Sequence, residues 1–165
     1  MINIREFRER DFGPLVALWH ATNLLSYPYV REHQEHTLAD ARHFFRSKLL
    51  RDCRVWVAES AGQLKGLLAL SDSWIRQLVV FSAFQRQGVG TALLTKAQVC
   101  SPANLRLHTF QRNIAARTFY EHHGFTVVAL GTSPAPESEP DVEYVWQAAS
   151  LASPTRSTPP ASSAR

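Results

Sequence analysis

The segment from Ile75 to Thr91 constrains the fold of this chain more than any other part of its sequence. It consists of an apolar run typical of a strand, a polar loop with glycines at 88 and 90, and the start of a helix with one apolar face. Loop amides and the free N–H groups of a helix's first turn converge on one point, where the helix dipole adds positive potential. Glycines let the backbone approach a ligand without an intervening Cβ. The segment therefore predicts an anion-binding loop that would fit a diphosphate.

Two common nucleotide-binding loops do not match this segment. A P-loop requires G-x-x-x-x-G-K-[ST], whereas Gly90 is followed by Thr91 and Ala92 with no lysine. The dinucleotide fingerprint requires G-x-G-x-x-G and an acidic residue about 20 residues later. Leu93 stands in place of its third glycine, and Phe110 lies near the position of the acid. We therefore expect neither ATP bound in the P-loop manner nor NAD.

Hydrophobic spacing along the rest of the chain predicts strands and helices in a definite order. Strands are expected at 2–7, 54–59, 63–70, 74–81, 105–110, 126–130 and 142–147, with a turn at Ala61-Gly62 between the second and third. Helices are expected around 15–25, 38–50, 89–100 and 114–123. This order indicates an α/β protein with a central mixed sheet flanked by helices.

Length and composition indicate one domain. At 165 residues, with 45% hydrophobic and 19% charged residues, the chain can bury an ordinary core. We expect this domain to span residues 1–150, and the Ser-, Pro-, Thr- and Ala-rich residues 151–165 to form a disordered tail. Apolar runs stay far below the roughly 20 residues that a membrane span needs, so no membrane partner is expected.

The cysteines and the charge distribution narrow the class of ligand. Cys53 and Cys100 form neither a C-x-x-C pair nor a zinc set with the histidines, so we expect no metal and reduced thiols in a cytoplasm. Between Ser60 and Tyr120 seven basic residues face one acid, Asp72, whereas the whole chain carries a net charge of only +4. This basic centre favours an anionic ligand over nucleic acid, although simple surface solvation explains the same charges equally well.

Two motifs in this basic centre resemble those of a known family. Gln85, Gly88 and Gly90 fit [QR]-x-x-G-x-[GA], which is motif A of the GNAT superfamily of N-acetyltransferases. The segment 113–125, NIAARTFYEHHGF, fits the family's N-x-x-A-x-x-F-Y-x-x-x-G-F signature. Both occur in the family's order and spacing within residues 74–125. The chain is thereby identified as similar to GNAT acetyltransferases, with acetyl-CoA as co-substrate.

The resemblance implies a location for the cofactor. Strand 74–81 would splay from strand 105–110, and the gap would hold the pantetheine arm of CoA. The pyrophosphate would lie on amides from Arg86 to Thr91, and Arg86, Lys96 and Arg117 are candidate cations beside the phosphates. Asn113 would cap its helix and contact CoA. The implied cofactor-binding residues are Leu78, Val79, Val80, Gln85, Arg86, Gln87, Gly88, Val89, Gly90, Thr91 and Asn113.

The resemblance also implies two catalytic candidates. Tyr120 would be the general acid that protonates the departing CoA thiolate, and the alternative is a tyrosine packed in the core beside Phe119. Many relatives carry an acid where this chain has Arg76 and Gln77, so that base is absent. His108 lies where some protein N-terminal acetyltransferases of the family place a glutamate. In a segment whose only acid is Asp72, it is either the general base or an ordinary strand residue.

The function that follows is direct transfer of acetyl from acetyl-CoA to a primary amine of a small molecule or peptide. The alternative is a non-catalytic acyl-CoA-binding module of the same fold, which the missing acid near Gln77 suggests. Tyr27, Tyr29 and His36 are candidates for the wall of the acceptor site, and we interpret residues 31–36 as a polar lead into a helix cap rather than a metal site. The resemblance allows a homodimer and names no acceptor amine.

Overall fold

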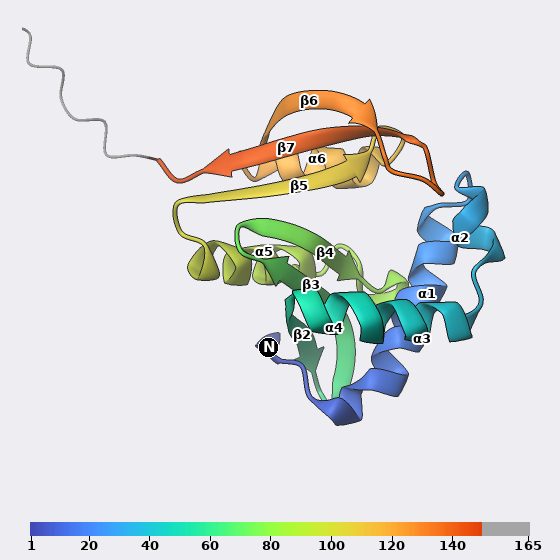
Figure 1. The fold of residues 1–165 in the computed structure, drawn as a ribbon. Helices are drawn as coiled ribbons and strands as arrows, with labels where there is room; N and C mark the ends of the chain where they lie inside the picture. Colours follow the sequence, from blue (N-terminus) through green and yellow to red (C-terminus); the bar gives the residue numbers. More distant parts are fainter. Residues whose placement is uncertain (150–165) are drawn as a thin grey trace, which may run out of the picture.

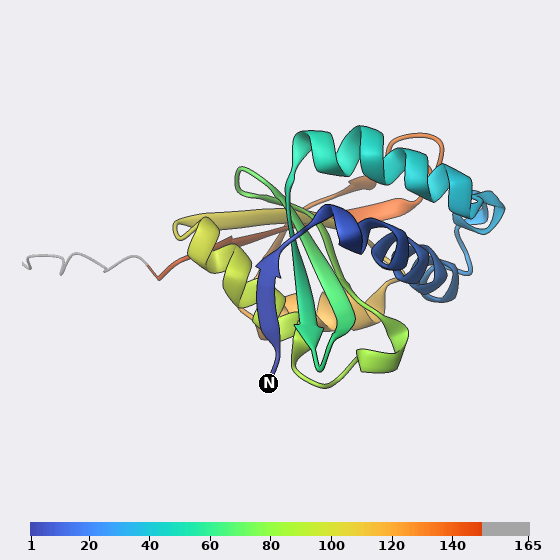
Figure 2. The ribbon, with the colours of Figure 1, turned by 90° about the horizontal axis from the view of Figure 1, so that it is seen from below.

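The computed structural model describes residues 1–149 and contains one seven-stranded mixed sheet with helices on both faces (Figures 1 and 2). The expected fold class is confirmed; the predicted tail at 151–165 lies outside the described residues. The strands are β1 (Asn3–Glu6), β2 (Arg54–Ser60), β3 (Gln63–Ser71), β4 (Trp74–Val80), β5 (Asn104–Phe110), β6 (Thr126–Thr132) and β7 (Pro140–Gln147). The helices are α1 (Phe12–Ser26), α2 (Arg31–Glu35), α3 (Leu38–Phe44), α4 (Leu50–Asp52), α5 (Val89–Cys100) and α6 (Ile114–His122), with short turns η1 (Glu9–Asp11), η2 (Phe45–Leu49) and η3 (Ser82–Phe84).

Local sequence signals account for several of these elements. Ala61 and Gly62 both have positive φ, which turns β2 back onto β3 at the predicted place. Thr37 and Asp40 form the capping box that begins α3, where the Asp40 amide donates to the Thr37 hydroxyl at 3.2 Å. The expected helix at 38–50 is one continuous run, which passes through a π-helical turn at η2 before it ends in α4.

Residues 31–36 form the predicted polar segment before the helix cap at Thr37, and they also contain a short helix. Arg31–Glu35 forms the short helix α2, in which Arg31 and Glu35 pair across one turn at 2.7 Å. The preceding Val30 is fully buried and anchors this helix to the domain. This short helix was not predicted, because a five-residue helix with one buried flanking residue leaves no apolar periodicity in the sequence.

The sheet divides the core into two clusters of buried side chains, one on each face. Leucines of α5, Tyr120 of α6 and inward residues of β5 and β7 make up the first cluster. The second contains Leu15 and Trp19 of α1, Phe45 of η2 and the opposite face of β2 and β3. Both cysteines are free thiols, and they pack against different clusters. Within the described residues, no helix is both long and apolar enough to cross a membrane.

The strand order β1-β2-β3-β4-β5-β7-β6 contains one parallel neighbour pair, β4 and β5. This pair is joined through a single register position, Trp74 opposite Arg106. By contrast, β5 pairs with β7 along its whole length, from Asn104 opposite Gln147 to Phe110 opposite Asp141. Beyond Trp74 the two parallel strands therefore separate, and the sheet opens into the wedge that the family resemblance implied.

Candidate functional site

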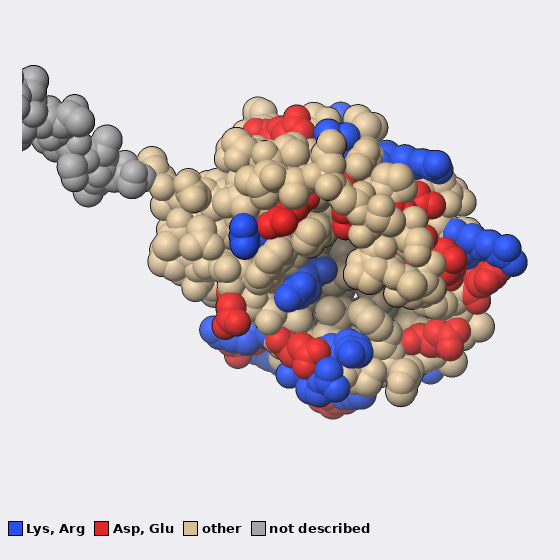
Figure 3. Space-filling model, turned by 45° about the horizontal axis from the view of Figure 1, so that its top comes forward, with Lys and Arg blue, Asp and Glu red and all other residues tan. Residues whose placement is uncertain are grey.

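A cavity of about 750 Å³ lies at this wedge and extends toward the N-terminal helices. Its walls come from α1, α2 and α3, from the facing parts of β4 and β5, from one face of α6, and from the connection between β6 and β7 with the adjoining strand ends. The face of the molecule shown in Figure 3 is hollowed near its centre, with both basic and acidic side chains around the hollow. Because separate elements supply each wall, the cavity brings together residues that are distant in the sequence.

The free edge of β4 forms one wall of the cavity. Leu78 and Val79 line it, whereas Val80 packs beneath the start of α5, with its Cγ2 3.5 Å from the position that a Cβ on Gly90 would take. On its other side β4 pairs with β3 from Gly66 opposite Val80 to Ser71 opposite Trp74. The β5-facing edge thus offers backbone N–H and C=O groups to whatever occupies the wedge.

The two motif glycines are required for different reasons. Gly88 is the N-cap of α5 with φ of +84°, a left-handed conformation that other residues adopt only with strain. Gly90 has an ordinary φ, but a Cβ there would lie 3.2 Å from the ring of Phe119. The expectation that both glycines only make room for a ligand is therefore incomplete, because Gly90 also makes room for α6. The first-turn amides of α5 still have no intrahelical carbonyl to donate to.

The remaining loop residues lie beyond the cavity wall, next to the end of β4. Gln85 donates from its amide to the Val80 carbonyl at 3.1 Å, and Gln87 to the Ala83 carbonyl at 3.3 Å, so both side chains fix the loop. Arg86 is exposed with positive φ, whereas Val89 is buried in the core, so that only its backbone amide is available to a ligand. The Thr91 hydroxyl lies 3.2 Å from Nε2 of His123.

Two of the cations suspected beside the phosphates have partners within the domain. Arg117 donates to the Tyr144 hydroxyl at 3.1 Å and to the Gln111 carbonyl at 3.2 Å. Lys96 lies over the ring of Trp56, 5.8 Å from its centre. These contacts favour a structural role for both, because a side chain held by internal partners is less free to move onto a phosphate.

Asn113 and Tyr120, at either end of α6, both line the cavity. Asn113 caps the helix as expected, since its Oδ1 accepts from the Ala116 amide at 3.2 Å. Tyr120 is 6% exposed, and its ring packs against Phe119 and Phe125. Burial, with a smaller contribution from nearby Tyr27, raises the pKa of the Tyr120 phenol above its ordinary value. The hydroxyl is therefore protonated at neutral pH and available as a proton donor.

His108 projects from β5 on the face opposite the buried Leu105 and Leu107, and it lines the cavity. Its ring stacks on Trp74 of β4, with centres 5.3 Å apart and planes 6° from parallel. Its Nδ1 lies 3.5 Å from Oδ2 of Asp141 on β7. We had expected no acid near this histidine. Asp141 was missed because the pairing of β5 with β7 brings it there, and the sequence around His108 gives no sign of that pairing.

The helical wall of the cavity is aromatic and polar. Trp19 donates from its indole N–H to Oε1 of Gln77 at 3.3 Å, so the residue that stands at the family's acid position is held by α1. Of the three candidate wall residues, Tyr27 and His36 line the cavity, whereas Tyr29 packs behind it against Tyr27 and Phe110. Burial raises the pKa of the Tyr27 phenol.

The connection between β6 and β7 contacts α2 at one side of the cavity. Oε1 of Glu137 lies 3.5 Å from Nε2 of His33. Burial lowers the pKa of His33, and the Glu137 carboxylate opposes that effect. Within residues 1–149, no group of three or more His, Cys, Asp or Glu side chains is placed to hold a metal ion.

These residues define a class of site. The Tyr120 phenol and the His108 imidazole share one cavity with a free strand edge, and the N-terminus of a helix lies where that strand ends. Such a site can hold an extended ligand with an anionic group at the helix end, and it can move protons at the ligand's other end.

Comparison with known proteins relates this class of site to a family. The sequence profile of the acetyltransferase (GNAT) domain matches residues 51–127. Peptidyl-lysine N-acetyltransferase YiaC of Escherichia coli is 26% identical over 126 residues, which cover 76% of this chain and 84% of that protein. The chain is therefore similar to acetyltransferases of the GNAT superfamily, as the two motifs indicated.

Solved structures extend the comparison to the fold. The apo form of YjaB from Escherichia coli has a TM-score of 0.74 and 24% identity, and the match covers 90% of this chain and 99% of that one. A Bacillus anthracis acetyltransferase in complex with acetyl coenzyme A has a TM-score of 0.54 and 20% identity, over 58% of this chain and 62% of that one. Both share the sheet and helix arrangement described above.

Proposed function

We propose that this protein is an acetyl-CoA-dependent N-acetyltransferase that transfers acetyl directly to a primary amine of a small molecule or peptide. The observation that carries the proposal is the placement of Tyr120 and His108 in one cavity with the free edge of β4. The donor and the acceptor of protons come from different elements, α6 and β5. A module that only bound acyl-CoA would have no need for both groups beside the reacting atoms.

Acetyl-CoA is the co-substrate that the family uses, and the wedge suits its shape. The pantetheine arm would lie between β4 and β5 and would pair with the backbone beside Leu78 and Val79. The diphosphate would accept hydrogen bonds from the amides of residues 86–91 at the start of α5, where the helix dipole favours negative charge. Asn113, already the cap of α6, would contact the arm from the opposite wall.

The reaction requires proton movements at the amine and at the leaving thiolate. An amine that binds as an ammonium first loses a proton to solvent; the neutral amine then attacks the thioester carbonyl carbon, and its nitrogen gives up a second proton, which His108 takes. The tetrahedral intermediate then collapses, the C–S bond breaks, and Tyr120 protonates the departing CoA thiolate. Burial of Tyr120 keeps its phenol protonated at the start of each cycle. Because acetyl passes straight to the amine, no acetyl-enzyme forms.

The acceptor end of the cavity favours a positively charged amine. Carboxylates of Asp40 and Glu137 contribute to its walls together with the aromatic rings of Trp19 and Phe110. Carboxylates and ring faces both attract ammonium groups. The name of the Escherichia coli relative, a peptidyl-lysine acetyltransferase, makes a lysine side chain one acceptor to test. We place the reaction in the cytoplasm, where free thiols such as Cys53 and Cys100 stay reduced.

The test is release of CoA thiol from acetyl-CoA in the presence of single amines: polyamines, aminoglycosides, amino acids, lysine peptides and peptide N-termini. We expect at least one amine to raise thiol release well above the rate without amine, with a matching mass increase of one acetyl group. Protection from thermal unfolding by acetyl-CoA without turnover for any amine would favour the non-catalytic module. The absence of both protection and turnover would contradict the proposal.

A further inference from the structure

We infer that Asp141 is a positioning residue, which orients His108 as the proton acceptor of the reaction. The inference rests on the proposed function. It assigns a role to a residue that neither family motif contains and that lies on β7, the strand next to β5. The evidence for this inference is the set of contacts around His108, Asp141 and Glu143.

The His108 ring is held on two sides. Trp74 of β4 stacks against one face, 5.3 Å away and nearly parallel. The Asp141 carboxylate lies 3.5 Å from Nδ1. The histidine side chain is 48% exposed, whereas that of Asp141 is only 10% exposed. A ring reached by solvent and substrate is thus backed by a carboxylate that is almost out of solvent.

The space for this carboxylate is built into the sheet. Asp141 pairs with Phe110 on β5 and with Gly131 on β6. A Cβ on Gly131 would lie 3.0 Å from Oδ1 of Asp141, so the glycine leaves room that a side chain would take. The Asp141 carbonyl also accepts from Nε2 of Gln111 at 3.0 Å, which fixes the backbone of this residue.

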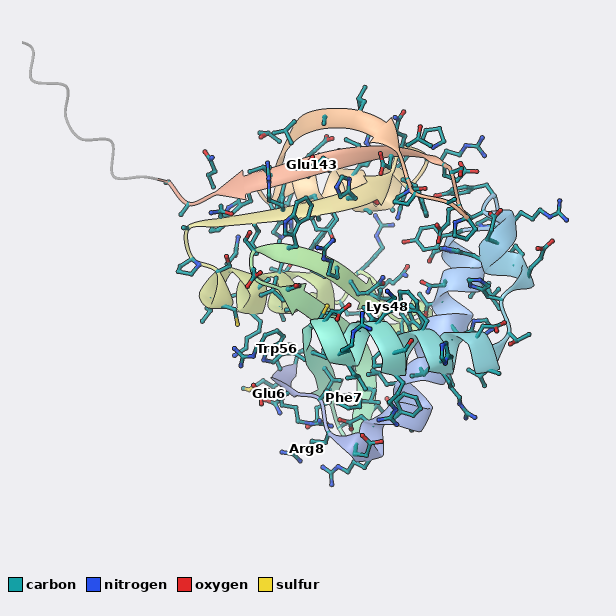
Figure 4. All side chains as sticks on the ribbon, in the orientation of Figure 1. Glu6, Phe7, Arg8, Lys48, Trp56 and Glu143 are labelled. Atoms are coloured by element: carbon teal, nitrogen blue, oxygen red, sulfur yellow. The ribbon has the colours of Figure 1, made fainter. Side chains whose placement is uncertain are left out.

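The neighbouring acid on the same strand serves a different partner. Glu143, labelled on β7 in Figure 4, lies directly opposite His108 in the ladder. Its carboxylate nevertheless pairs with Arg106 at 3.3 Å. Register alone would assign Glu143 to the histidine, whereas the side-chain geometry assigns Asp141. The two acids therefore form a natural test pair.

The chemistry follows from the two ring nitrogens. If Nδ1–H faces the carboxylate, Nε2 is left with its lone pair and accepts the proton that the acceptor amine loses. The ring then carries a positive charge, which the Asp141 carboxylate stabilises without taking the proton itself. The proton leaves from Nε2 to solvent after the acetylated amine departs, which restores the neutral ring.

Kinetics of four variants test the inference: Asp141→Asn, Glu143→Gln, His108→Ala and the His108→Ala/Asp141→Asn double variant. With the best amine from the screen, we expect Asp141→Asn to lower kcat by about 10–100-fold with little change in KM for acetyl-CoA. Glu143→Gln should stay within about twofold of wild type. The double variant should be no slower than His108→Ala, since the carboxylate acts only through the ring. If the losses of kcat in His108→Ala and Asp141→Asn multiplied in the double variant, the inference would be overturned. Equal losses of kcat in Asp141→Asn and Glu143→Gln would also overturn it.

A second measurement does not depend on turnover. The ¹⁵N chemical shifts of His108 distinguish the tautomer protonated at Nδ1 from that protonated at Nε2. We expect the Nδ1–H tautomer in wild type and in Glu143→Gln, and loss of this preference in Asp141→Asn. The Nε2–H tautomer in wild type would overturn the inference even if Asp141→Asn failed to fold. These chemical shifts are measured without substrate. If the protein acetylated no amine, the proposed function would be contradicted, but the tautomer of His108 would still test the role of Asp141.

Discussion

Tyr120 is the residue on which the proposed chemistry depends most, and its surroundings distinguish two roles. Its ring packs in the core with Phe125 and Tyr144, and its phenol is at the wall of the cavity. The sequence left a packing role and a catalytic role as alternatives. The structure makes them compatible, because one face of a buried tyrosine can fill the core while its hydroxyl serves the site.

Tyr120→Phe keeps the ring and removes only the proton donor. We expect acetyl-CoA to protect this variant from thermal unfolding as it does wild type, while kcat falls by about 10²–10⁴. The matched control is Tyr144→Phe, another buried tyrosine, whose hydroxyl contacts Arg117 and Glu121 rather than the cavity. That control should lose about 1 kcal/mol of stability and little activity. Full activity of Tyr120→Phe would remove this tyrosine from the mechanism.

The raised pKa of Tyr120 gives a further prediction at this scale. Burial favours the neutral phenol, so its proton stays on through pH 10, where a free tyrosine is half ionised. We therefore expect ionisation of Tyr120 to cause no loss of kcat below pH 10. The pH profiles of wild type and Tyr120→Phe should then have the same shape up to that pH. A basic limb near pH 8 or 9 that is present in wild type and absent from the residual activity of Tyr120→Phe would show that the phenol ionises more easily than its burial implies.

At the scale of elements, the loop before α5 depends on a glycine with a left-handed backbone, Gly88. Gly88→Ala should cost about 1–2 kcal/mol, because φ of +84° is strained for alanine. Gly62→Ala is a close control, since Gly62 has φ of +74° in the turn between β2 and β3. Among the described residues, nothing lies within 4 Å of a Cβ at either position.

We expect both glycine variants to melt earlier than wild type, but only Gly88→Ala to lose most of its protection by acetyl-CoA. The reason is that a change of backbone at Gly88 redirects the amides that would receive the diphosphate. Melting curves with and without acetyl-CoA measure both effects. Equal protection of the two variants would mean that the diphosphate does not lie at the start of α5.

An ion pair between Arg5 and Asp11 joins two neighbouring elements, β1 and η1. Arg5 donates to both carboxylate oxygens of Asp11 at 2.8 and 2.9 Å, and their side chains are 13% and 6% exposed. The hydrogen bonds from Arg5 hold the pKa of Asp11 below its usual value, and they outweigh the opposing effect of burial. The pair therefore stabilises the fold fully above the pKa of an unfolded aspartate, and this contribution disappears as pH falls through the lowered folded value.

Asp11→Asn should lower the free energy of unfolding at pH 7 by about 3 kcal/mol, because it leaves Arg5 without its main partner. The variant should also lose less stability than wild type between pH 5 and pH 2. Denaturant titrations across this range measure both effects. Glu6→Gln is the control, since its partner Arg54 and Glu6 itself are each 68% exposed, and it should change stability by less than about 1 kcal/mol. Identical pH dependence in wild type and Asp11→Asn would contradict the role given to this pair.

At the scale of the whole molecule, sequence patterns predicted the order and type of nearly every element. Period-two and helical spacing sufficed for the hairpin of β2 and β3 and for α5, because each buries one regular face. They failed at α2, which is too short to show a period. They also gave no register, so the approach of Asp141 to His108 and the contact of Trp19 with Gln77 could not be foreseen. Motifs located the loop and Tyr120, whereas the partners of these residues come from strand pairing over long distances in the chain.

The central claim is that one cavity brings acetyl-CoA and the acceptor amine together for direct transfer. Initial velocities measured with both substrates varied test it most directly. Direct transfer within a ternary complex predicts reciprocal plots that intersect, with CoA released only when amine is present. Parallel lines, together with a burst of CoA before amine is added, would indicate an acetyl-enzyme and contradict the account.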